Sequence, residues 1–218
     1  MTSNIAFLDD AVGEYLAAHT TPPTPIEQRL IDLTQTMAGA SMQIGHPQVR
    51  FMALLARIMR PQVVVEIGTF TGYSALVVAQ ELDASATLIA CDISDEWTSI
   101  GRPYWAEAGV ADRIDVRIGA ASESLAALPA DMVVDLAFID ADKTGYLGYI
   151  EQLIPHMNDR TVVLVDNVLW DGKIVDDSDQ SADTVALRDF NREVLANPSI
   201  DVALLPVGDG LSMITLAR

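Results

Sequence analysis

Three oxygen-bearing side chains stand at the ends of two short apolar runs of the sequence. Asp140 follows the run 135–139, and Asp166 and Asn167 follow the run 161–165. Carboxylate and amide oxygens bind Mg²⁺, Mn²⁺ or Ca²⁺ in preference to zinc, and no His or Cys accompanies them. Any one of these residues could simply shape a loop. Together, at one end of one sheet, they favour a divalent-cation site.

Two acidic residues frame a glycine turn earlier in the chain. The segment 66–74 reads Glu-Ile-Gly-Thr-Phe-Thr-Gly-Tyr-Ser, and Asp92 follows a second apolar run. Its two glycines are spaced G-x-x-x-G, whereas a pyrophosphate needs the G-x-G-x-x-G turn. A ligand with a carboxylate and an ammonium could use the backbone N–H groups and Glu66, and a carboxylate placed like Asp92 commonly accepts both hydroxyls of a ribose. The pattern favours a nucleoside ligand over a purely structural turn.

Other polar residues have simpler interpretations. We expect Asp142 to cap the helix that starts near Tyr146, and Cys91 to be a small core residue. At least one of Tyr146 and Tyr149 should line the site, because both follow Lys143 at helical spacing, and packing is the alternative explanation. The histidines are expected at the surface or at helix ends: His19, His46 and His156. Two polar residues of the last helix receive no role from the sequence: Arg188 and Asn191.

The elements that must position these side chains can be read from the periodicity of apolar residues. Five runs of strand length alternate with helical patterns: 63–67, 87–91, 114–118, 135–139 and 161–165. Such alternation is typical of a mostly parallel sheet covered by helices on both faces, with ligands beyond the carboxyl ends of the strands. Helical patterns precede the sheet at 4–18, 24–38 and 47–59, and another follows near 184–196.

The runs 200–205 and 211–216 face each other across Pro206 and the turn 208–210, which predicts a hairpin that ends the sheet with an antiparallel strand. We therefore expect an α/β fold in one domain over residues 1–218. It would consist of a helical preface, 1–60, and a doubly wound core, 61–218.

Composition narrows the class of partner. The 218 residues include 13 Lys and Arg against 31 Asp and Glu, a formal charge of −18. A surface this negative repels phosphate backbones, so nucleic acid and anionic membranes are poor partners. A single cysteine permits no internal disulfide, and no segment reaches the roughly 18 apolar residues of a membrane span. We expect a soluble, cytoplasmic protein.

Five ordered motifs resemble the cation-dependent small O-methyltransferases. This family includes plant caffeoyl-CoA O-methyltransferase, its bacterial relatives and, more distantly, catechol O-methyltransferase. The motifs occupy residues 42–44, 66–74, 138–143, 166–170 and 205–211. The resemblance covers the chain from about residue 25. It implies a Rossmann-like, seven-stranded methyltransferase fold, S-adenosylmethionine as methyl donor, and a homodimer.

The resemblance also implies roles for individual positions. It places the donor against Met42, Glu66, Gly68, Thr69, Phe70, Ser74, Asp92, Ala121 and Asp140. The cation falls to Asp140, Asp166 and Asn167, and the acceptor to Lys143, Asn167 and Trp170. Lys143, with Asp140 beside it, takes the place of the catalytic base. From its apolar neighbours alone, Met42 would be a core residue.

Two departures from the plant pattern bear on the acceptor. Between Gly172 and Ala186 the chain has a short acidic loop in place of a longer insertion rich in Arg and Tyr. The loop carries four aspartates that would repel the phosphates of coenzyme A: Asp176, Asp177, Asp179 and Asp183. Asp171 stands where the plant enzymes have Asn, so contacts there do not transfer. A free catechol-like acceptor is favoured over a CoA thioester.

The predicted reaction is transfer of one methyl group to one hydroxyl of a vicinal dihydroxy-aromatic compound. Three protein ligands leave about three positions on Mg²⁺, which two adjacent phenol oxygens can fill. Lys143 must be uncharged to take the proton. Three other classes of function stay open. An NAD-dependent oxidoreductase is disfavoured by the missing glycine motif, and RNA methylation is disfavoured by the negative charge. The third class is a non-catalytic nucleoside- or metal-binding module. The acceptor, the hydroxyl methylated, the physiological metal and the pathway cannot be read from the sequence.

Overall fold

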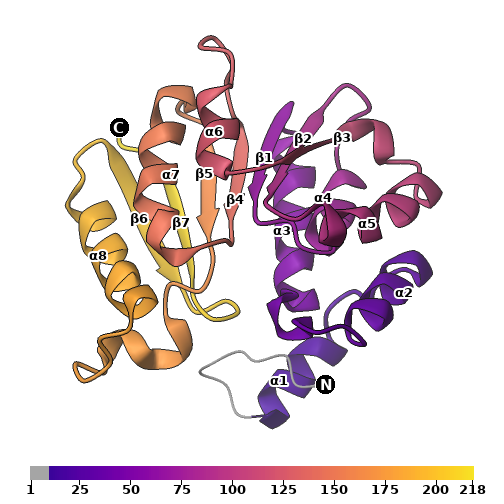
Figure 1. Cartoon of the computed structure of the whole chain (residues 1–218), viewed down its shortest axis with the longest axis horizontal. Helices are drawn as coiled ribbons and strands as arrows, with labels where there is room; N and C mark the ends of the chain where they lie inside the picture. The colour runs from indigo at the N-terminus through magenta and orange to yellow at the C-terminus, as the bar shows by residue number, and fades with distance from the viewer. Residues whose placement is uncertain (1–9) are drawn as a thin grey trace.

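The computed structural model describes residues 10–218, which form one seven-stranded sheet with helices on both faces (Figure 1). The strands are β1 (Val63–Ile67), β2 (Thr87–Asp92), β3 (Ile114–Ile118), β4 (Leu136–Ile139), β5 (Val162–Val165), β6 (Ile200–Leu205) and β7 (Leu211–Leu216). The helices are α1 (Asp10–Ala18), α2 (Pro25–Thr34), α3 (His46–Met59), α4 (Tyr73–Ala79), α5 (Asp95–Glu107), α6 (Ala121–Ala126), α7 (Tyr146–Leu153) and α8 (Ala182–Ala196). Short 3₁₀ segments join them: η1 (Ala40–Met42), η2 (Ala111–Arg113), η3 (Lys143–Gly145), η4 (Ile154–His156) and η5 (Trp170–Val175).

The strand order is β3-β2-β1-β4-β5-β7-β6. The first five strands run parallel, with Val64 of β1 paired to Leu88 of β2 and to Leu136 of β4. Strand β7 is antiparallel to both of its neighbours, β5 and β6, which confirms the predicted hairpin. Strands β2 and β3 follow on one side of β1, and β4 and β5 follow on its other side, so the topological switch point lies between β1 and β4. Ligands of such sheets bind at this switch point.

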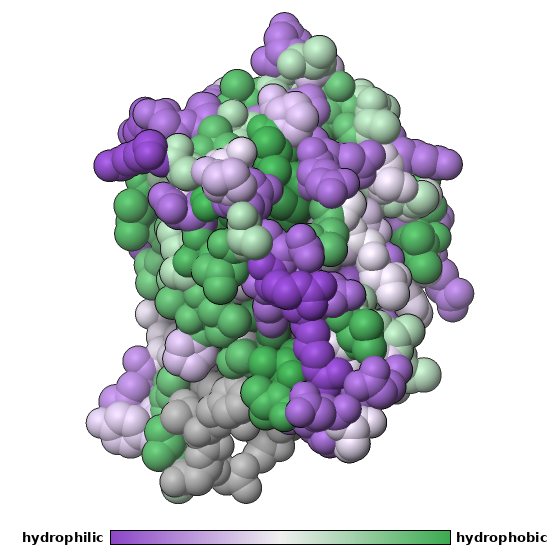
Figure 2. Space-filling view, turned by 90° about the vertical axis from the view of Figure 1, so that its left-hand side faces the viewer, coloured by the Kyte–Doolittle hydropathy of each residue, from purple (hydrophilic) through white to green (hydrophobic). Residues whose placement is uncertain are grey.

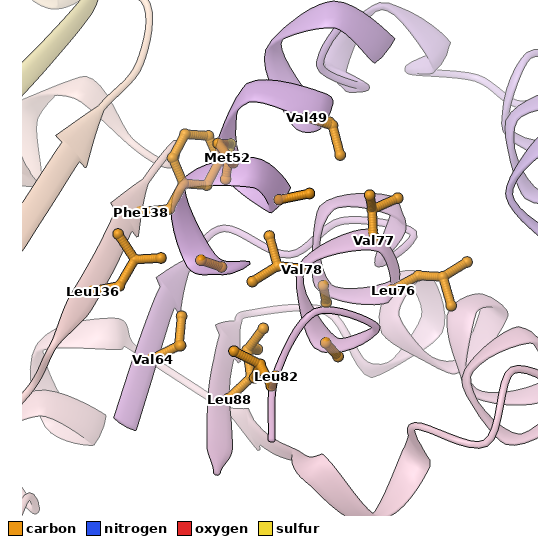
Figure 3. Close-up of a cluster of buried hydrophobic side chains, with 14 of the residues drawn as sticks. Val49, Met52, Val64, Leu76, Val77, Val78, Leu82, Leu88, Leu136 and Phe138 are labelled. Atoms are coloured by element: carbon orange, nitrogen blue, oxygen red, sulfur yellow. The ribbon is translucent and has the colours of Figure 1, made fainter. Parts of the chain in front are cut away.

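Each face of the sheet has its own apolar core, because alternate strand residues point to opposite sides. Val64 faces α3 and α4, whereas Val65 and Ile67 face the side covered by α6, α7 and α8. Figure 3 shows the first core, in which strand residues such as Leu88 and Phe138 lie opposite helix residues. Both faces are therefore closed to water, and the polar groups at the strand ends remain the accessible ones.

The helical preface differs in extent from its prediction. The predicted helix 4–18 is described only from Asp10, and its first six residues lie outside the described part. The predicted helix 24–38 ends at Thr34, after starting with a capping box in which the Thr24 hydroxyl accepts from the Glu27 N–H. The hydroxyls of Thr34 and Thr36 donate to the carbonyls of Leu30 and Leu33, a local competition that weakens helical continuation. Within residues 10–218, no helix combines the length and apolarity needed to cross a membrane.

Candidate active site

A large cleft lies at the carboxyl ends of the central strands, where β1 and β4 are neighbours in the sheet. Its walls bring together all of the predicted site residues except Glu66: Met42, Gly68, Thr69, Phe70, Ser74, Asp92, Ala121, Asp140, Lys143, Asp166, Asn167 and Trp170. The cleft is also lined by residues of α1 and α3, of the segments just after α1 and just before α3, and of the β6–β7 loop: Leu16, Gln48, Thr20, Gly45, Gly208 and Asp209. Residues 100 positions apart in sequence therefore share one site.

The glycine turn after β1 is held by Asp92. One carboxylate oxygen, Oδ2, accepts from the backbone N–H groups of Thr69 and Phe70 at 2.9 and 2.7 Å, and Oδ1 accepts from Ser94 N–H at 2.8 Å. Gly68 has a φ of +89°, and a Cβ there would lie 1.9 Å from the Asp140 carbonyl oxygen. The turn thus needs glycine, and Asp92 braces it, a role that the sequence did not reveal.

Glu66 lies beneath this turn and not on the wall of the cleft. Its side chain is 2 % exposed, and burial raises its pKa to about 7 although the nearby Ser74 and Thr69 hydroxyls counteract this in part. A cavity of about 10 Å³ adjoins it, lined otherwise by apolar residues. Water in a buried site needs two to four polar partners, and this cavity offers one. The predicted contact between Glu66 and a donor ammonium stays a prediction.

Lys143 joins three polar side chains of the site. Its Nζ donates to Asp140 Oδ1 at 3.0 Å, to Asn167 Oδ1 at 2.7 Å and to the Tyr146 hydroxyl at 2.7 Å. The ammonium is 5.5 Å from the centre of the Trp170 ring, within range of a cation–π attraction. The side chain is only 9 % exposed, so these contacts are shielded from bulk water. The predicted base and two of the predicted cation ligands thus form one network.

Asp166 is the most deeply placed acid of this network. It is 2 % exposed, and burial, followed by the neighbouring Asp140 carboxylate, raises its pKa to about 8. Asn167, with a φ of +60°, donates its N–H to Asp166 Oδ1 at 2.7 Å. Gln48 on α3 faces the same carboxyl and lowers its pKa, yet its buried Nε2 has no hydrogen-bond partner of normal geometry. The sequence analysis did not identify Gln48 as a site residue. A polar residue among the apolar positions of a helix was the signal that could have indicated it.

The donor set is chemically suited to a hard cation. Among residues 10–218, no three His, Cys, Asp or Glu side chains come together as a metal site, so the predicted set depends on the amide oxygen of Asn167 as its third ligand. The carboxylates of Asp140 and Asp166 lie close together, and burial raises the pKa of Asp166. A bound cation would offset their negative charge. The oxygens of Asp140 and Asn167 now accept from Lys143, so an ammonium and a divalent cation draw on the same atoms.

Four smaller expectations can be compared with the structure. Asp142 makes no capping hydrogen bond; its Oδ1 accepts from the Tyr149 hydroxyl at 2.5 Å, so the capping prediction is wrong. Met42 is not a core residue, because η1 turns it outward to 44 % exposure at the cleft. Cys91 is buried, as expected. The histidines do lie at helix ends: His19 after α1, His46 at the start of α3 and His156 at the end of η4.

The comparisons with known proteins agree with this geometry. A family model described as O-methyltransferase matches residues 18–218. A probable caffeoyl-CoA O-methyltransferase of Dictyostelium discoideum is 32 % identical over 95 % of this chain and 92 % of its own. A caffeoyl-CoA O-methyltransferase of Eucalyptus gunnii is 33 % identical over 94 % of this chain and 86 % of its own.

Solved structures show the same arrangement. A methyltransferase of Podospora anserina bound to S-adenosylhomocysteine superposes with a TM-score of 0.87 and 27 % identity, covering 96 % of this chain and 95 % of that one. An O-methyltransferase of Bacillus cereus, also in complex with S-adenosylhomocysteine, gives 0.86 and 25 %, covering 95 % and 97 %. The sheet, its cleft and the extent of these matches lead to one conclusion: the chain belongs to the O-methyltransferase family.

Proposed function

We propose that this protein transfers a methyl group from S-adenosylmethionine to one hydroxyl of a small vicinal dihydroxy-aromatic acceptor, with the help of a divalent cation. The observation that carries the proposal is the network of Lys143 with Asp140 and Asn167, beside buried Asp166, in the cleft that the glycine turn also lines. Methyl transfer by the family favours this reaction over the NAD-dependent and non-catalytic alternatives.

The donor would occupy the part of the cleft between the glycine turn and Asp92. Two similar structures hold S-adenosylhomocysteine, the product that this donor leaves behind. Here Asp92 keeps the Thr69 and Phe70 backbone in place, and the close approach of Gly68 to Asp140 joins this region to the acidic network. S-adenosylmethionine supplies a methyl group already activated by its sulfonium, so orientation is most of what the protein must add.

The acidic network would prepare the acceptor. Asp140, Asp166 and Asn167 would hold the cation, which when bound supplies Lewis-acid attraction for phenolic oxygen and lowers its pKa. Lys143 Nζ would accept the hydroxyl proton, for which it must be uncharged. Trp170, next to Lys143, would form an apolar wall against the aromatic ring.

The charge of the cleft favours a small acceptor over a coenzyme A thioester. Asp171, Asp183 and Asp209 line the cleft on the side of Trp170, and the chain carries a formal charge of −18. These carboxylates would repel the phosphates of coenzyme A. The names of the curated relatives point the other way, toward caffeoyl-CoA, so both acceptors belong in the test.

We also propose a homodimer. Exposed apolar side chains support it: Leu54 and Ile58 lie about one turn apart on α3 and are 44 % and 79 % exposed, and Leu204 of the edge strand β6 is 44 % exposed. On the face that carries α8 and β6, hydrophobic residues gather in patches beside hydrophilic ones (Figure 2). Large apolar patches on a protein surface mark protein–protein contacts, and these exposed side chains are candidates for such a contact.

The decisive experiment is an acceptor panel with methyl-labelled S-adenosylmethionine, run with Mg²⁺ and after EDTA treatment. We expect transfer to catechol, caffeate or dihydroxylated aminobenzoates in preference to caffeoyl-CoA, and loss of transfer when the metal is removed. Full activity on catechols after EDTA treatment would show that the cation mechanism is wrong. Preference for caffeoyl-CoA would overturn the acceptor assignment while leaving the reaction class intact.

A further inference from the structure

The side chain of Arg188, on α8, donates several hydrogen bonds to the backbone of the loop that precedes this helix. Its Nε donates to the carbonyl of Ile174 at 2.9 Å, Nη1 to that of Asp179 at 2.8 Å, and Nη2 to those of Lys173, at 2.9 Å, and Asp176. These four hydrogen bonds all end at main-chain carbonyl oxygens, although the loop is rich in aspartate. Figure 1 shows this loop, in orange, folded back against α8.

A second residue of the same helix holds the start of that segment. Asn191 lies about one turn beyond Arg188, and its Nδ2 donates to the Val168 carbonyl at 2.8 Å. Between the two anchor points, Trp170, Asp171 and Gly172 have φ values of +49°, +51° and +78°. Non-glycine residues rarely adopt this conformation, and it persists only where surrounding contacts impose it.

The segment held in this way forms the acceptor side of the cleft. Trp170 and Asp171 line the cleft, and the Asp171 N–H donates to Asp209 Oδ1 at 2.7 Å. Two ammonium groups lie near the Trp170 ring, with Lys143 Nζ and Lys173 Nζ each 5.5 Å from its centre. A shift of the segment would therefore move the aromatic wall relative to the proposed base.

We propose that Arg188 is a positioning residue that sets the shape of the acceptor wall, η5, and thereby restricts the site to small acceptors. The inference rests on the proposed function, since it needs an acceptor at Trp170. The guanidinium presents five N–H groups in a rigid planar fork, which can serve four carbonyls at once. A lysine has three donors on a flexible stem and cannot replace it. Arg188 binds carbonyl oxygens, whereas the carboxylates of Asp176 and Asp179 accept hydrogen bonds from Ser178 and Ser181 within the loop.

The test compares Arg188→Lys and Arg188→Met with the same changes at Arg192. Arg192 lies on the same helix, is 64 % exposed in its side chain, and pairs with Asp189 instead of the loop. For both Arg188 variants we expect the KM for catechol to rise at least about tenfold, because small displacements of positioning groups have large kinetic effects. Preference for catechol over bulkier diols should fall. Calorimetry should show unchanged affinity for S-adenosylmethionine, and both Arg192 variants should behave as wild type.

A measurement without turnover separates this inference from the proposed function. Fluorescence assigned to Trp170, by subtracting the signal of Trp170→Phe, should become more accessible to acrylamide in the Arg188 variants and not in the Arg192 variants. If no diol is methylated by the wild-type protein, the proposed function fails, whereas the quenching result still tests whether Arg188 holds the acceptor wall. Unchanged quenching shows that Arg188 does not hold it. Increased quenching with unchanged KM and selectivity would show that Arg188 does not position the acceptor. Equal losses of donor affinity and kcat in the Arg188 variants would show the same. Arg188→Lys keeps the test valid if Arg188→Met does not fold.

Discussion

Lys143 uses its three N–H donors on the oxygens of Asp140, Asn167 and Tyr146. Replacing it by alanine should lower kcat about 10²- to 10⁴-fold, the usual contribution of a positioned base, while the affinity for S-adenosylmethionine changes little. Steady-state kinetics and calorimetry on the purified variant check both halves. Donor affinity that collapses together with kcat would contradict the separation of base from donor site.

Asp92→Ala is the contrasting change at the donor side. It removes the acceptor of the Thr69 and Phe70 N–H groups as well as the predicted partner of the ribose. Loss of one charge-assisted hydrogen-bond partner costs roughly 1.5–3 kcal/mol, or about ten- to a hundredfold in affinity. Calorimetry with S-adenosylmethionine should show at least this loss. Affinity equal to that of Lys143→Ala would mean that Asp92 neither binds the donor nor shapes its turn.

Glu66 makes the stability of the fold depend on pH. Burial raises its folded pKa from 4.5 to about 7, so between these values the folded state holds a proton that the unfolded state has lost. Stability from this group is therefore present below pH 4.5 and falls as pH rises to about 7, by about 3 kcal/mol. Denaturant unfolding at pH 5 and pH 8 should show Glu66→Gln gaining relative to wild type at the higher pH. The same pH dependence in both proteins would contradict the burial argument.

At the scale of elements, the turn between β1 and α4 depends on a residue without a side chain. Gly68→Ala would place Cβ 1.9 Å from the Asp140 carbonyl oxygen, whereas Gly109→Ala, at a φ of +70°, meets no atom within 4 Å. Gly109→Ala is the control, and it should lower the free energy of unfolding by about 1 kcal/mol from backbone strain alone. We expect Gly68→Ala to cost at least about 2 kcal/mol more in urea unfolding, and to lose donor binding. Equal costs at the two positions would remove the case for the close approach.

The sequence predicted elements better than it predicted contacts between them. Apolar runs identified the parallel strands, because strands buried on both faces are continuously apolar, and the turn 208–210 between two further runs identified the antiparallel hairpin. The partner of Asp142 was missed because Tyr149, which lies in the next helix, competes with the cap. The burial of Glu66 was missed because its position at the end of a strand does not show that the following turn covers its side chain. Arg188 could not be assigned since its partners are backbone carbonyls, which leave no mark in residue type.

For the whole molecule, the proposed homodimer gives a direct prediction. Light scattering should find a mass of twice the 23.5 kDa of one chain. Ile58→Glu, on the exposed face of α3, should shift this mass toward the monomer because a charge would be buried in the contact. Ile118→Glu, at a 45 % exposed position of β3, the strand at the opposite edge of the sheet from β6, is the control and should stay dimeric. A wild-type monomer would refute the dimer, and a dimeric Ile58→Glu would place the contact elsewhere.

The insertion of β7 between β5 and β6 constrains the order in which the molecule can assemble during synthesis. Strand β6 leaves the ribosome before β7, yet within residues 10–218 β7 is its only neighbour in the sheet. Until residues 211–216 emerge, β6 lacks this partner and β5 presents an unpaired apolar edge. Such edges invite pairing with other chains. A chain interrupted before residue 211 would therefore carry most of the apolar core of the protein and also a surface prone to aggregation, so the final hairpin completes the sheet and protects it.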